Sequence, residues 1–345
     1  MSNKILVTGC AGFIGAALVK ELLFRGNDVI GLDNINDYYD VNLKRKRLHC
    51  IEDIKNKGRG KFEYFEFDLQ NIGLLEDNIF LKNEISTVVN LAAQAGVRYS
   101  LEKPHKYVQS NLVGFFNILE LSRKYKINNF LYASSSSVYG GNESFPFSEE
   151  QSVDHPVSFY AATKKSNELM AHSYSHLYNL PCTGLRFFTV YGPWGRPDMS
   201  YYIFTSKILN NEPIKVFNNG EMMRDFTYID DVIDSIVKLI NKPPSKNNKF
   251  EGNSNLGFES WAPFKIFNIG NSSPINLIEF INIIEEYLGL KAKKEFLPMQ
   301  LGDLKATSAE INLLNNWVGF KPKTSIKEGL KNFIDWYINY YEKSY

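Results

Sequence analysis

The sequence predicts an α/β fold: a doubly wound parallel sheet joined to a smaller, mixed α/β lobe in the C-terminal part. Two observations carry this prediction. Over residues 1–190, short apolar runs alternate with helical patterns, which is typical of βαβ units and of a parallel sheet with helices on both faces. Beyond that point the turn-forming segment GPWGRP (192–197) interrupts the alternation, and a less regular, more helical region follows.

The expected elements follow from these patterns. Strands are expected at residues 4–8, 28–33, 62–68, 87–91, 129–134 and 182–186. Helices are expected at residues 12–25, 104–125 and 160–178, and later at 203–210, 228–241, 276–288 and 325–341. In the helix at 104–125, a buried stripe is predicted from the spacing of Val108, Leu112, Phe115 and Leu119. Residues 242–263, rich in Pro, Lys, Asn, Ser and Gly, are expected to form an exposed loop.

Composition excludes several classes of protein. Lys and Arg total 39 against 38 Asp and Glu, so the net charge of +1 disfavours a nucleic-acid binder. No apolar run approaches the ~18 residues of a membrane helix, and the N-terminus lacks a signal-peptide pattern. The three cysteines, Cys10, Cys50 and Cys182, lack metal-site spacing. We therefore expect free thiols, no metal, no membrane partner and a cytoplasmic location.

A glycine-rich turn follows the first predicted strand. In TGCAGFIG (residues 8–15), Gly9, Gly12 and Gly15 recur every third residue and open a helix, an arrangement suited to a pyrophosphate at the helix N-terminus. Asp33 follows this helix at the end of the second strand, where it can bind an adenosine ribose. Asp33 would repel a 2′-phosphate, and the residue after it is Asn34 rather than arginine. The sequence thus predicts a Rossmann-like site for NAD rather than NADP.

A basic run, KRKR (residues 44–47), lies beyond this loop. It could contact phosphates, but such a run is more often the solvated face of a helix, and this is the interpretation we favour.

A tyrosine and a lysine provide the predicted acid–base chemistry. In YAATK (residues 160–164), Tyr160 and Lys164 lie one helical turn apart, and a nearby lysine and a nicotinamide cation would favour the phenolate. The apolar strand at 129–134 runs into the hydroxyl-rich stretch SSSS (residues 134–137). Ligands of open parallel sheets bind at such strand ends, so a serine there could hold a substrate hydroxyl while Tyr160 removes its proton.

Beyond these motifs, the chain resembles the extended short-chain dehydrogenase/reductase superfamily over residues 3 to about 341. Within that superfamily (the NAD-dependent epimerases and dehydratases) it is similar to the UDP-glucuronate 4-epimerases. The narrower resemblance is carried by GLDNINDYYD (31–40), AAQAGVRYS (92–100), RFFTVYGPWGRPD (186–198), MRDFTYIDD (223–231) and QLGD (300–303). It implies an NAD-binding Rossmann domain at residues 1–190. Residues 191–345 would then form mainly a UDP-sugar-binding lobe, with some segments returning to the first domain.

The resemblance also implies site residues. The catalytic group would be Tyr160, Lys164, Ser135 and Ser137, the last replacing a threonine common in relatives. The cofactor site would comprise Gly9, Gly12, Phe13, Ile14, Gly15, Asp33, Asn34, Asp68, Leu69, Leu91, Ala92, Ala93, Tyr160 and Lys164. The substrate site would comprise Ser137, Tyr160, Thr189, Arg196, Val216, Phe217, Arg224 and Asp303. Of these, Thr189 and Arg196 would meet a sugar carboxylate, Arg224 and Asp303 the diphosphate and uridine ribose, and Val216 and Phe217 the uracil.

The implied activity is NAD-dependent interconversion of UDP-glucuronate and UDP-galacturonate through a transient 4-keto sugar, by a homodimer paired through the helices near 104–125 and 160–178. A 4,6-dehydratase needs acid–base carboxylates after the strand-end serines, and none follows Ser137 there. A UDP-glucuronate decarboxylase commonly carries glutamate in place of Ser137. A 4-epimerase of UDP-glucose or of a UDP-N-acetylhexosamine, which shares Tyr160 and Lys164, stays open, although Arg196 favours an acid sugar. A non-catalytic NAD-sensing module is disfavoured because both Tyr160 and Lys164 are present.

Overall fold

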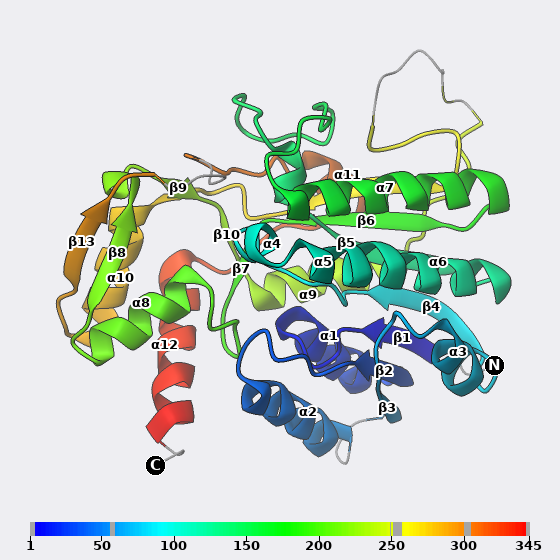
Figure 1. The fold of residues 1–345 in the computed structure, drawn as a ribbon, viewed down its shortest axis with the longest axis horizontal. Helices are drawn as coiled ribbons and strands as arrows, with labels where there is room; N and C mark the ends of the chain where they lie inside the picture. The colour runs from blue at the N-terminus through cyan, green and yellow to red at the C-terminus, as the bar shows by residue number, and fades with distance from the viewer. Residues whose placement is uncertain (1–3, 56–58, 249, 251–256, 300–304, 343–345) are drawn as a thin grey trace.

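A seven-stranded parallel sheet forms the centre of the larger lobe (Figure 1). The computed structural model describes residues 4–55, 59–248, 250, 257–299 and 305–342. The strand order is β11-β6-β5-β4-β1-β2-β3, so successive strands are added on one side of β1 up to β3 and on its other side from β4 onward. The strands are β1 (Lys4–Thr8), β2 (Val29–Asp33), β3 (Phe62–Glu66), β4 (Ile85–Asn90), β5 (Asn129–Ser135), β6 (Cys182–Phe187) and β11 (Phe264–Ile269). The six strands predicted within residues 1–190 are confirmed, with small differences in their bounds.

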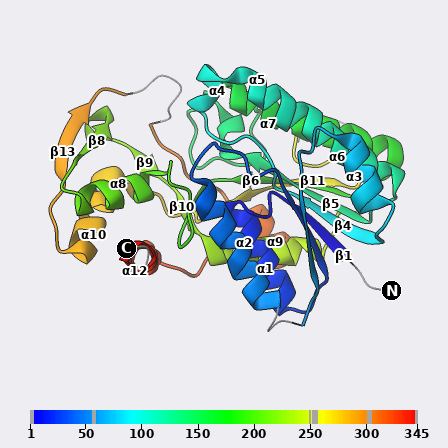
Figure 2. The same ribbon diagram turned by 60° about the horizontal axis from the view of Figure 1, so that its bottom comes forward.

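Helices cover both faces of this sheet, as the sequence predicts (Figure 2). One layer contains α1 (Phe13–Phe24), α2 (Val41–Lys55) and α9 (Ile229–Ile240), and α1 packs against both of the others. The opposite layer contains α3 (Ile72–Leu75), η1 (Glu76–Phe80), α4 (Tyr99–Glu102), α5 (Pro104–Tyr107), η2 (Val108–Gly114), α6 (Phe115–Lys124) and α7 (Phe159–Tyr178). The central strand residues are buried between the two layers, which leaves the carboxyl ends of the strands as the place for a site.

The helix predicted at 104–125 contains a π-helical segment, η2, that shifts its buried face. Asn111 is 1% exposed and Tyr107 is fully buried, whereas Val108 and Leu112 of the predicted stripe are only half-buried. The wider π turn rotates the chain relative to a regular α-helix, so the α-helical period gives the wrong phase there. Phe115 and Leu119, beyond the π turn, are buried as predicted.

The smaller lobe is built mainly from the C-terminal part of the chain (Figure 1). Its longest strands, β8 (Pro213–Phe217) and β13 (Lys293–Leu297), pair in parallel. Helix α8 (Ser200–Leu209) packs on β8, and α10 (Leu277–Leu288) packs on α8 and on α12 (Ile326–Glu342). Short strand pairs join it to the larger lobe: β7 (Thr189–Tyr191) with β10 (Phe226–Tyr228), and β9 (Met223–Arg224) with β12 (Ile275–Asn276). The helices expected at 203–210, 228–241, 276–288 and 325–341 correspond to α8, α9, α10 and α12.

The chain returns to the larger lobe after residue 190. Helix α9 packs on α1, α11 (Asn312–Val318) packs on β11 and α9, and β11 extends the sheet beside β6. A division at residue 190 therefore stays a prediction. The described part of the 242–263 segment has no helix or strand, but Phe258 and Ala262 within it are buried, contrary to the expected exposure. Among the described helices, none has the length and apolarity needed to span a membrane.

Candidate active site

The glycine turn between β1 and α1 is too crowded for side chains. Gly9 has a φ of +72°, and a Cβ there would lie 2.8 Å from the backbone nitrogen of Ala92. A Cβ on Gly15 would lie 2.1 Å from the carbonyl oxygen of Gly9. Gly12 precedes α1, and no side chain in the described structure caps this helix start. The turn therefore exposes backbone N–H groups at the positive end of α1, as an anion such as a pyrophosphate requires.

Asp33 ends β2 beside this turn. Its carboxylate accepts hydrogen bonds from the backbone nitrogens of Ala11 (3.0 Å) and Ile35 (2.9 Å), which fix its orientation. Burial raises the pKa of Asp33, while these hydrogen bonds and the charges of Lys44 and Arg47 act in the opposite direction. Its carboxylate is thus held rigidly at the edge of the cavity described next, ready to accept from a ligand hydroxyl.

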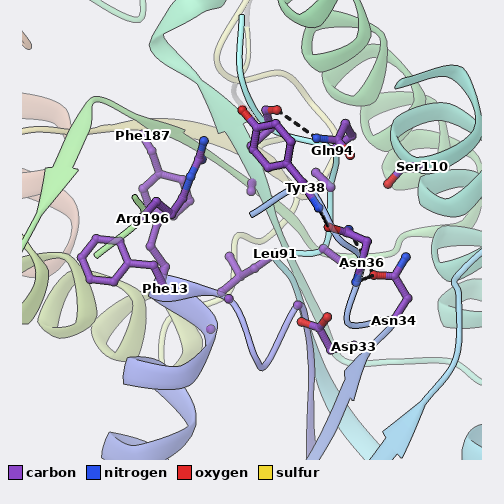
Figure 3. A pocket seen from close by; sticks show the side chains of 18 of the residues that line it. Phe13, Asp33, Asn34, Asn36, Tyr38, Leu91, Gln94, Ser110, Phe187 and Arg196 are labelled. Carbon is purple, nitrogen blue, oxygen red and sulfur yellow. Dashed lines mark hydrogen bonds between the residues drawn. The ribbon is translucent and has the colours of Figure 1, made fainter. Parts of the chain in front are cut away.

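A cavity of about 260 Å³ opens at the carboxyl ends of the strands and brings most of the predicted residues together (Figure 3). It is lined by Gly9, Gly12, Phe13, Ile14, Gly15, Asp33, Asn34, Asp68, Leu69, Leu91, Ala92, Ala93, Ser135, Tyr160, Lys164 and Arg196, among others. In Figure 3, Asp33 and Asn34 lie at one end and Phe13, Phe187 and Arg196 at the other, with Leu91 between them. The strand order reverses above this cavity, where open α/β sheets bind ligands.

Helix α7 carries the tyrosine and lysine. Ser158 caps its start by accepting a hydrogen bond from the backbone nitrogen of Ala161 at 3.1 Å. Lys164 is 3% exposed, its Nζ donates to the carbonyl oxygen of Ala133 at 2.8 Å, and burial lowers its pKa to about 8. The same Nζ lies 5.9 Å from the ring centroid of Tyr160, so the two side chains are neighbours in the cavity wall.

The protein by itself does not lower the pKa of Tyr160, which corrects part of the sequence-based expectation. Burial raises this pKa, and the opposing groups are Ser135, through a hydrogen bond, and Arg196, through its charge. Lys164 is directed to a carbonyl on β5 rather than to the phenol. A charge that enters with a ligand would have to complete the activation of Tyr160.

The hydroxyl-rich stretch forms a tight turn after β5. Ser135 is 8% exposed and lines the cavity, and its Oγ both accepts from the backbone nitrogen of Ser137 and donates to the Ser137 Oγ, each at 3.1 Å. Residues Ser136–Tyr139 continue as a short 3₁₀ turn, η3. Ser137 itself is outside the described cavity lining and reaches it only through Ser135.

A buried ion pair lies beneath this catalytic end. Glu168, one turn after Lys164 on α7, accepts two hydrogen bonds from Arg186 on β6, at 2.9 and 3.0 Å. Both side chains are at most 2% exposed. Ser134 donates to the same carboxylate at 2.6 Å. Glu168 therefore fixes α7 against β5 and β6, and with it the position of Tyr160 relative to Ser135.

The buried Asn111 of η2 links further parts of the site. Its side chain accepts from the backbone nitrogen of Gln94 at 2.8 Å and donates to Thr163 at 3.1 Å, and its carbonyl oxygen accepts from Asn167 at 2.7 Å. Asn111 thus joins the loop after β4, which lines the cavity, to α7. A π-helical segment at this point directs a polar side chain inward, which agrees with the frequent occurrence of such segments at functional sites.

Arg196 enters the cavity from the loop after β7, but its guanidinium already has a partner. It donates through Nε and Nη2 to the two oxygens of Asp198, and Tyr38 donates to Asp198 at 3.0 Å. Burial lowers the pKa of Arg196, but the charge of Asp198 outweighs it and keeps the pKa above its ordinary value. Arg196 is a permanent cation here, and its Nη1 has no partner among the described hydrogen bonds from this guanidinium.

Four of the remaining predicted substrate residues, Thr189, Val216, Phe217 and Arg224, are not among those that line the cavity. Thr189 is on β7, where its backbone nitrogen donates to the carbonyl oxygen of Asp225 at 3.3 Å. Val216 and Phe217 are on β8, and the side chain of Val216 is fully buried in the core, so only its backbone is available to a ligand. Arg224 is on β9 and donates to the carbonyl oxygen of Met223 at 2.9 Å. Asp303 is outside the described residues.

Sequence reasoning missed several residues of the site. Tyr38, Gln94, Phe187 and Met199 line the cavity, and Asp198 holds Arg196. All except Met199 fall within the strings that carry the family resemblance, which was the available signal, but nothing in the sequence indicates which of them meet across two lobes. The basic run was predicted correctly only in part: Arg45 and Lys46 are exposed, as expected of a solvated helix face, whereas Lys44 and Arg47 are 4% and 1% exposed.

The sheet topology, the glycine turn with Asp33, and the Tyr160–Lys164 pair beside a strand-end serine define a Rossmann-type dinucleotide enzyme that works on a hydroxyl-bearing substrate. A comparison with family models gives a narrower result: the chain belongs to the NAD dependent epimerase/dehydratase family, whose model matches residues 5–257.

Individual relatives match over the whole chain. Protein CapI of Staphylococcus aureus is 54% identical over 340 residues, which cover 99% of this chain and 100% of that protein. A probable UDP-glucuronate 4-epimerase of Rhizobium meliloti (strain 1021) is 44% identical over 348 residues, 99% of each chain. Among solved structures, the UDP-glucuronic acid 4-epimerase from Bacillus cereus, in complex with UDP-glucuronic acid and NAD, superimposes with a TM-score of 0.83 at 32% identity, covering 98% of this chain and 100% of that one.

Proposed function

We propose that this protein is an NAD-dependent 4-epimerase that interconverts UDP-glucuronate and UDP-galacturonate. The observation that carries the proposal is the composition of the cavity: the glycine turn and Asp33 line one part, and Tyr160, Ser135 and the cationic Arg196 line another. A single cavity thus combines a dinucleotide-binding pattern, a proton acceptor and a group complementary to a carboxylate. The relatives named as UDP-glucuronate 4-epimerases support the same substrate.

The residues present fit NAD. The glycine turn offers uncapped N–H groups to a pyrophosphate, and Asp33 is held in place by two backbone hydrogen bonds for an adenosine ribose. Beside Asp33, Asn34 donates to Asp68 at 2.7 Å. The described lining at this end of the cavity carries these two carboxylates and lacks an arginine that could bind a 2′-phosphate. When bound, NAD supplies a reversible hydride acceptor for C4 of the sugar.

The chain's own residues supply proton transfer. Tyr160 takes the proton of the C4 hydroxyl and returns it when the ketone is reduced, while Ser135 holds that hydroxyl by a hydrogen bond. Lys164 is kept close to Tyr160 by its bond to Ala133. We assign Ser137 to the sugar through Ser135, and Thr189 to the sugar carboxylate together with Arg196. Arg224, Asp303, Val216 and Phe217 stay assigned to the UDP part, with Val216 acting through its backbone.

The placement of acidic residues favours epimerisation over dehydration. The carboxylates in the described lining are Asp33, which ends β2, and Asp68, which follows β3, and both lie at the end assigned to adenosine. A dehydratase would need an acid or base beside Tyr160 to remove the C5 proton and protonate the leaving hydroxyl. An epimerase needs only Tyr160, because the keto sugar turns over and is reduced on its other face.

Arg196 favours an acid sugar over UDP-glucose or a UDP-N-acetylhexosamine. A guanidinium donates to a carboxylate in a charge-assisted manner, whereas a neutral hydroxymethyl group gives it only a weaker acceptor. Asp198 uses Nε and Nη2, which leaves Nη1 for the sugar.

We also propose a cytoplasmic homodimer. Apolar side chains are exposed on the helices named for pairing, including Phe116 (44%) on α6 and Leu169 (58%) and Leu177 (63%) on α7. Burying them against a second copy would form a four-helix bundle. The free cysteines agree with a reducing compartment. Light scattering of the purified protein would measure its mass in solution, and a monomer at micromolar concentration would refute the pairing.

The activity is tested by incubating purified protein with UDP-glucuronate, without added NAD, and separating the products by chromatography with mass detection. We expect UDP-galacturonate, of unchanged mass, to approach equilibrium with the substrate. Formation of a UDP-pentose would indicate a decarboxylase, and conversion of UDP-glucose but not UDP-glucuronate would indicate the neutral-sugar epimerase.

A further inference from the structure

Arg47, on α2, is one of the most deeply buried side chains of the protein. It is 1% exposed, and its guanidinium bonds to three segments of the chain: the glycine turn, the loop before α2, and the remote loop at Trp194 and Gly195. From Nη1 it donates to the carbonyl oxygen of Ala11 in the glycine turn (3.1 Å) and to the hydroxyl of Tyr39 (2.6 Å). From Nε and Nη2 it donates to the carbonyl oxygen of Trp194 (3.1 and 2.6 Å), and from Nη2 also to that of Gly195 (3.1 Å).

Every one of these acceptors is a neutral oxygen. Among the described residues, no carboxylate bonds to the Arg47 guanidinium. Its charge acts on Asp33 without a hydrogen bond and lowers the pKa of that carboxyl, against the effect of burial. A buried cation without a bonded counter-ion is costly to retain, and hydrogen bonds alone offset only part of that cost. We therefore expect a role that needs a planar guanidinium, whose donors can bond to the glycine turn and to the loop at Trp194 at the same time.

The segment that Arg47 holds leads directly to Arg196. Trp194 has a φ of +64°, and its ring packs against Trp336 (5.3 Å between centroids) and Tyr340 (5.4 Å) on α12. At Gly195 a Cβ would lie 2.1 Å from the hydroxyl oxygen of Tyr201, so the backbone cannot move toward that side. The segment is thus fixed by aromatic rings on one side and by Arg47 on the other.

We propose that Arg47 is a positioning residue for recognition of the acid sugar: it ties the backbone at Trp194 and Gly195 to the glycine turn and so sets where Arg196 enters the cavity. The inference rests on the proposed function, because it assigns Arg196 to the sugar carboxylate. It predicts that losing the tie weakens binding of an acid sugar nucleotide more than binding of a neutral one.

The test compares binding of UDP-glucuronate and UDP-glucose to NAD-loaded protein by isothermal titration calorimetry. In Arg47→Met we expect the Kd for UDP-glucuronate to rise about 10-fold and that for UDP-glucose less than about 2-fold, since one charge-assisted bond is misplaced. Arg47→Lys keeps the charge but cannot reach both loops, so its loss should be in the same direction. Arg45→Met is the matched control: Arg45 is on the same helix, exposed, and paired with Glu66 at the surface.

The Arg196→Ala background distinguishes a positioning role of Arg47 from a merely structural one. In that background, Arg47→Met should change the Kd for UDP-glucuronate by less than about 2-fold, because the residue through which it acts is gone. Equal weakening of both sugar nucleotides by the Arg47 variants, or full additivity with Arg196→Ala, would overturn the proposal. If Arg47→Met does not fold by circular dichroism, Arg47→Lys decides by the same two comparisons. Failure of the proposed function would be seen separately, as wild-type protein that does not convert UDP-glucuronate.

Discussion

The two fully buried arginines of this protein are held in opposite ways. Arg186, beneath the catalytic end of the sheet, has a carboxylate partner, Glu168, bonded at two points. Arg47, beside the glycine turn, is bonded by neutral oxygens from three segments of the chain. The first arrangement joins neighbouring elements of the sheet, whereas the second joins the two halves of the cavity. The arginine beneath the proton-transfer residues is thus neutralised by a carboxylate, whereas the arginine beside the region assigned to substrate recognition is bonded mainly to backbone carbonyl groups.

This difference leads to distinct expectations for substitutions. Changes near Arg186 should affect folding or turnover, because they alter the support of Tyr160 and Ser135. Changes near Arg196 should affect which sugar binds and what becomes of it, because that region contributes no proton-transfer group.

The largest expected effect is on stability, from Glu168→Ala. It leaves Arg186 as a buried cation without its partner, and breaking such a pair costs on the order of 3–5 kcal/mol. Urea unfolding followed by circular dichroism measures the change. The control is Glu120→Ala, which removes a part-exposed ion pair with Arg123 and should cost about 1 kcal/mol or less. Equal losses in the two variants would mean that the buried pair contributes no more than the surface one.

Tyr160→Phe tests the catalytic half. The variant keeps the ring and loses the proton acceptor, so we expect turnover to fall by about 10²-fold or more while folding and NAD content are unchanged. Turnover is measured by chromatography of the sugar nucleotides, and NAD content by absorbance after denaturation. Near-wild-type turnover would remove Tyr160 from the mechanism.

Glu149 tests whether a second buried carboxyl near Arg186 keeps a raised pKa when the charge of Arg186 is already paired with Glu168. Burial raises the pKa of Glu149 to about 7, although a hydrogen bond from the backbone of Asn268 and the charge of Arg186 lower it. Because the folded-state pKa lies above the ordinary value of 4.5, the neutral carboxyl contributes stability that is fully present below pH 4.5 and is lost as pH rises through 7.

Glu149→Gln keeps the carbonyl acceptor and removes this titration. Relative to the variant, the free energy of unfolding of the wild type should fall by about 3 kcal/mol between pH 4.5 and pH 8. Urea unfolding at the two pH values measures it, with the exposed neighbour Glu150→Gln as control. A difference between wild type and Glu149→Gln that is the same at both pH values would contradict a shifted pKa.

Arg196→Ala tests the recognition half and has the smallest expected effect. A 4-keto uronate is a β-keto acid, which loses CO₂ when its C5–C6 bond aligns with the carbonyl π system. Arg196 would hold the carboxylate out of that alignment, with Thr189 and Ser137 as hydroxyl partners. We expect the KM for UDP-glucuronate to rise about 10-fold and the share of UDP-4-keto-pentose to increase, as measured by mass. Unchanged KM and unchanged CO₂ loss would refute this role.

The sequence predicted the proton-transfer half of the molecule better than the recognition half. The six strands within residues 1–190, the glycine turn with Asp33, and the Tyr160–Lys164 pair depend on local patterns, and the structure brings the glycine turn, Asp33 and the pair to one cavity. Strand β11 was missed because it lies far along the chain, after a segment without periodicity, and pairs with β6 only in the folded sheet.

Other features depend on contacts that local patterns do not record. The π turn of η2 changed the phase of the buried face, so Asn111 was overlooked. The run at 44–47 was taken as solvated because charge predicts exposure on average; this holds for Arg45 and Lys46, but Arg47 is buried and one of its acceptors is the carbonyl oxygen of Trp194, which is remote in the sequence. Tyr38 and Asp198 are likewise adjacent only across the two lobes.

The central claim is that the hydrogen removed from C4 returns to the same carbon on the opposite face without leaving the cavity, while Tyr160 moves only the proton of the C4 hydroxyl. It is tested most directly with UDP-glucuronate deuterated at C4, incubated with the purified protein in ordinary water without added cofactor, and analysed by mass spectrometry and NMR. The account predicts UDP-galacturonate that keeps its deuterium at C4, with no accumulation of NADH. Loss of the deuterium to solvent, or a labelled product that lacks C6, would contradict it.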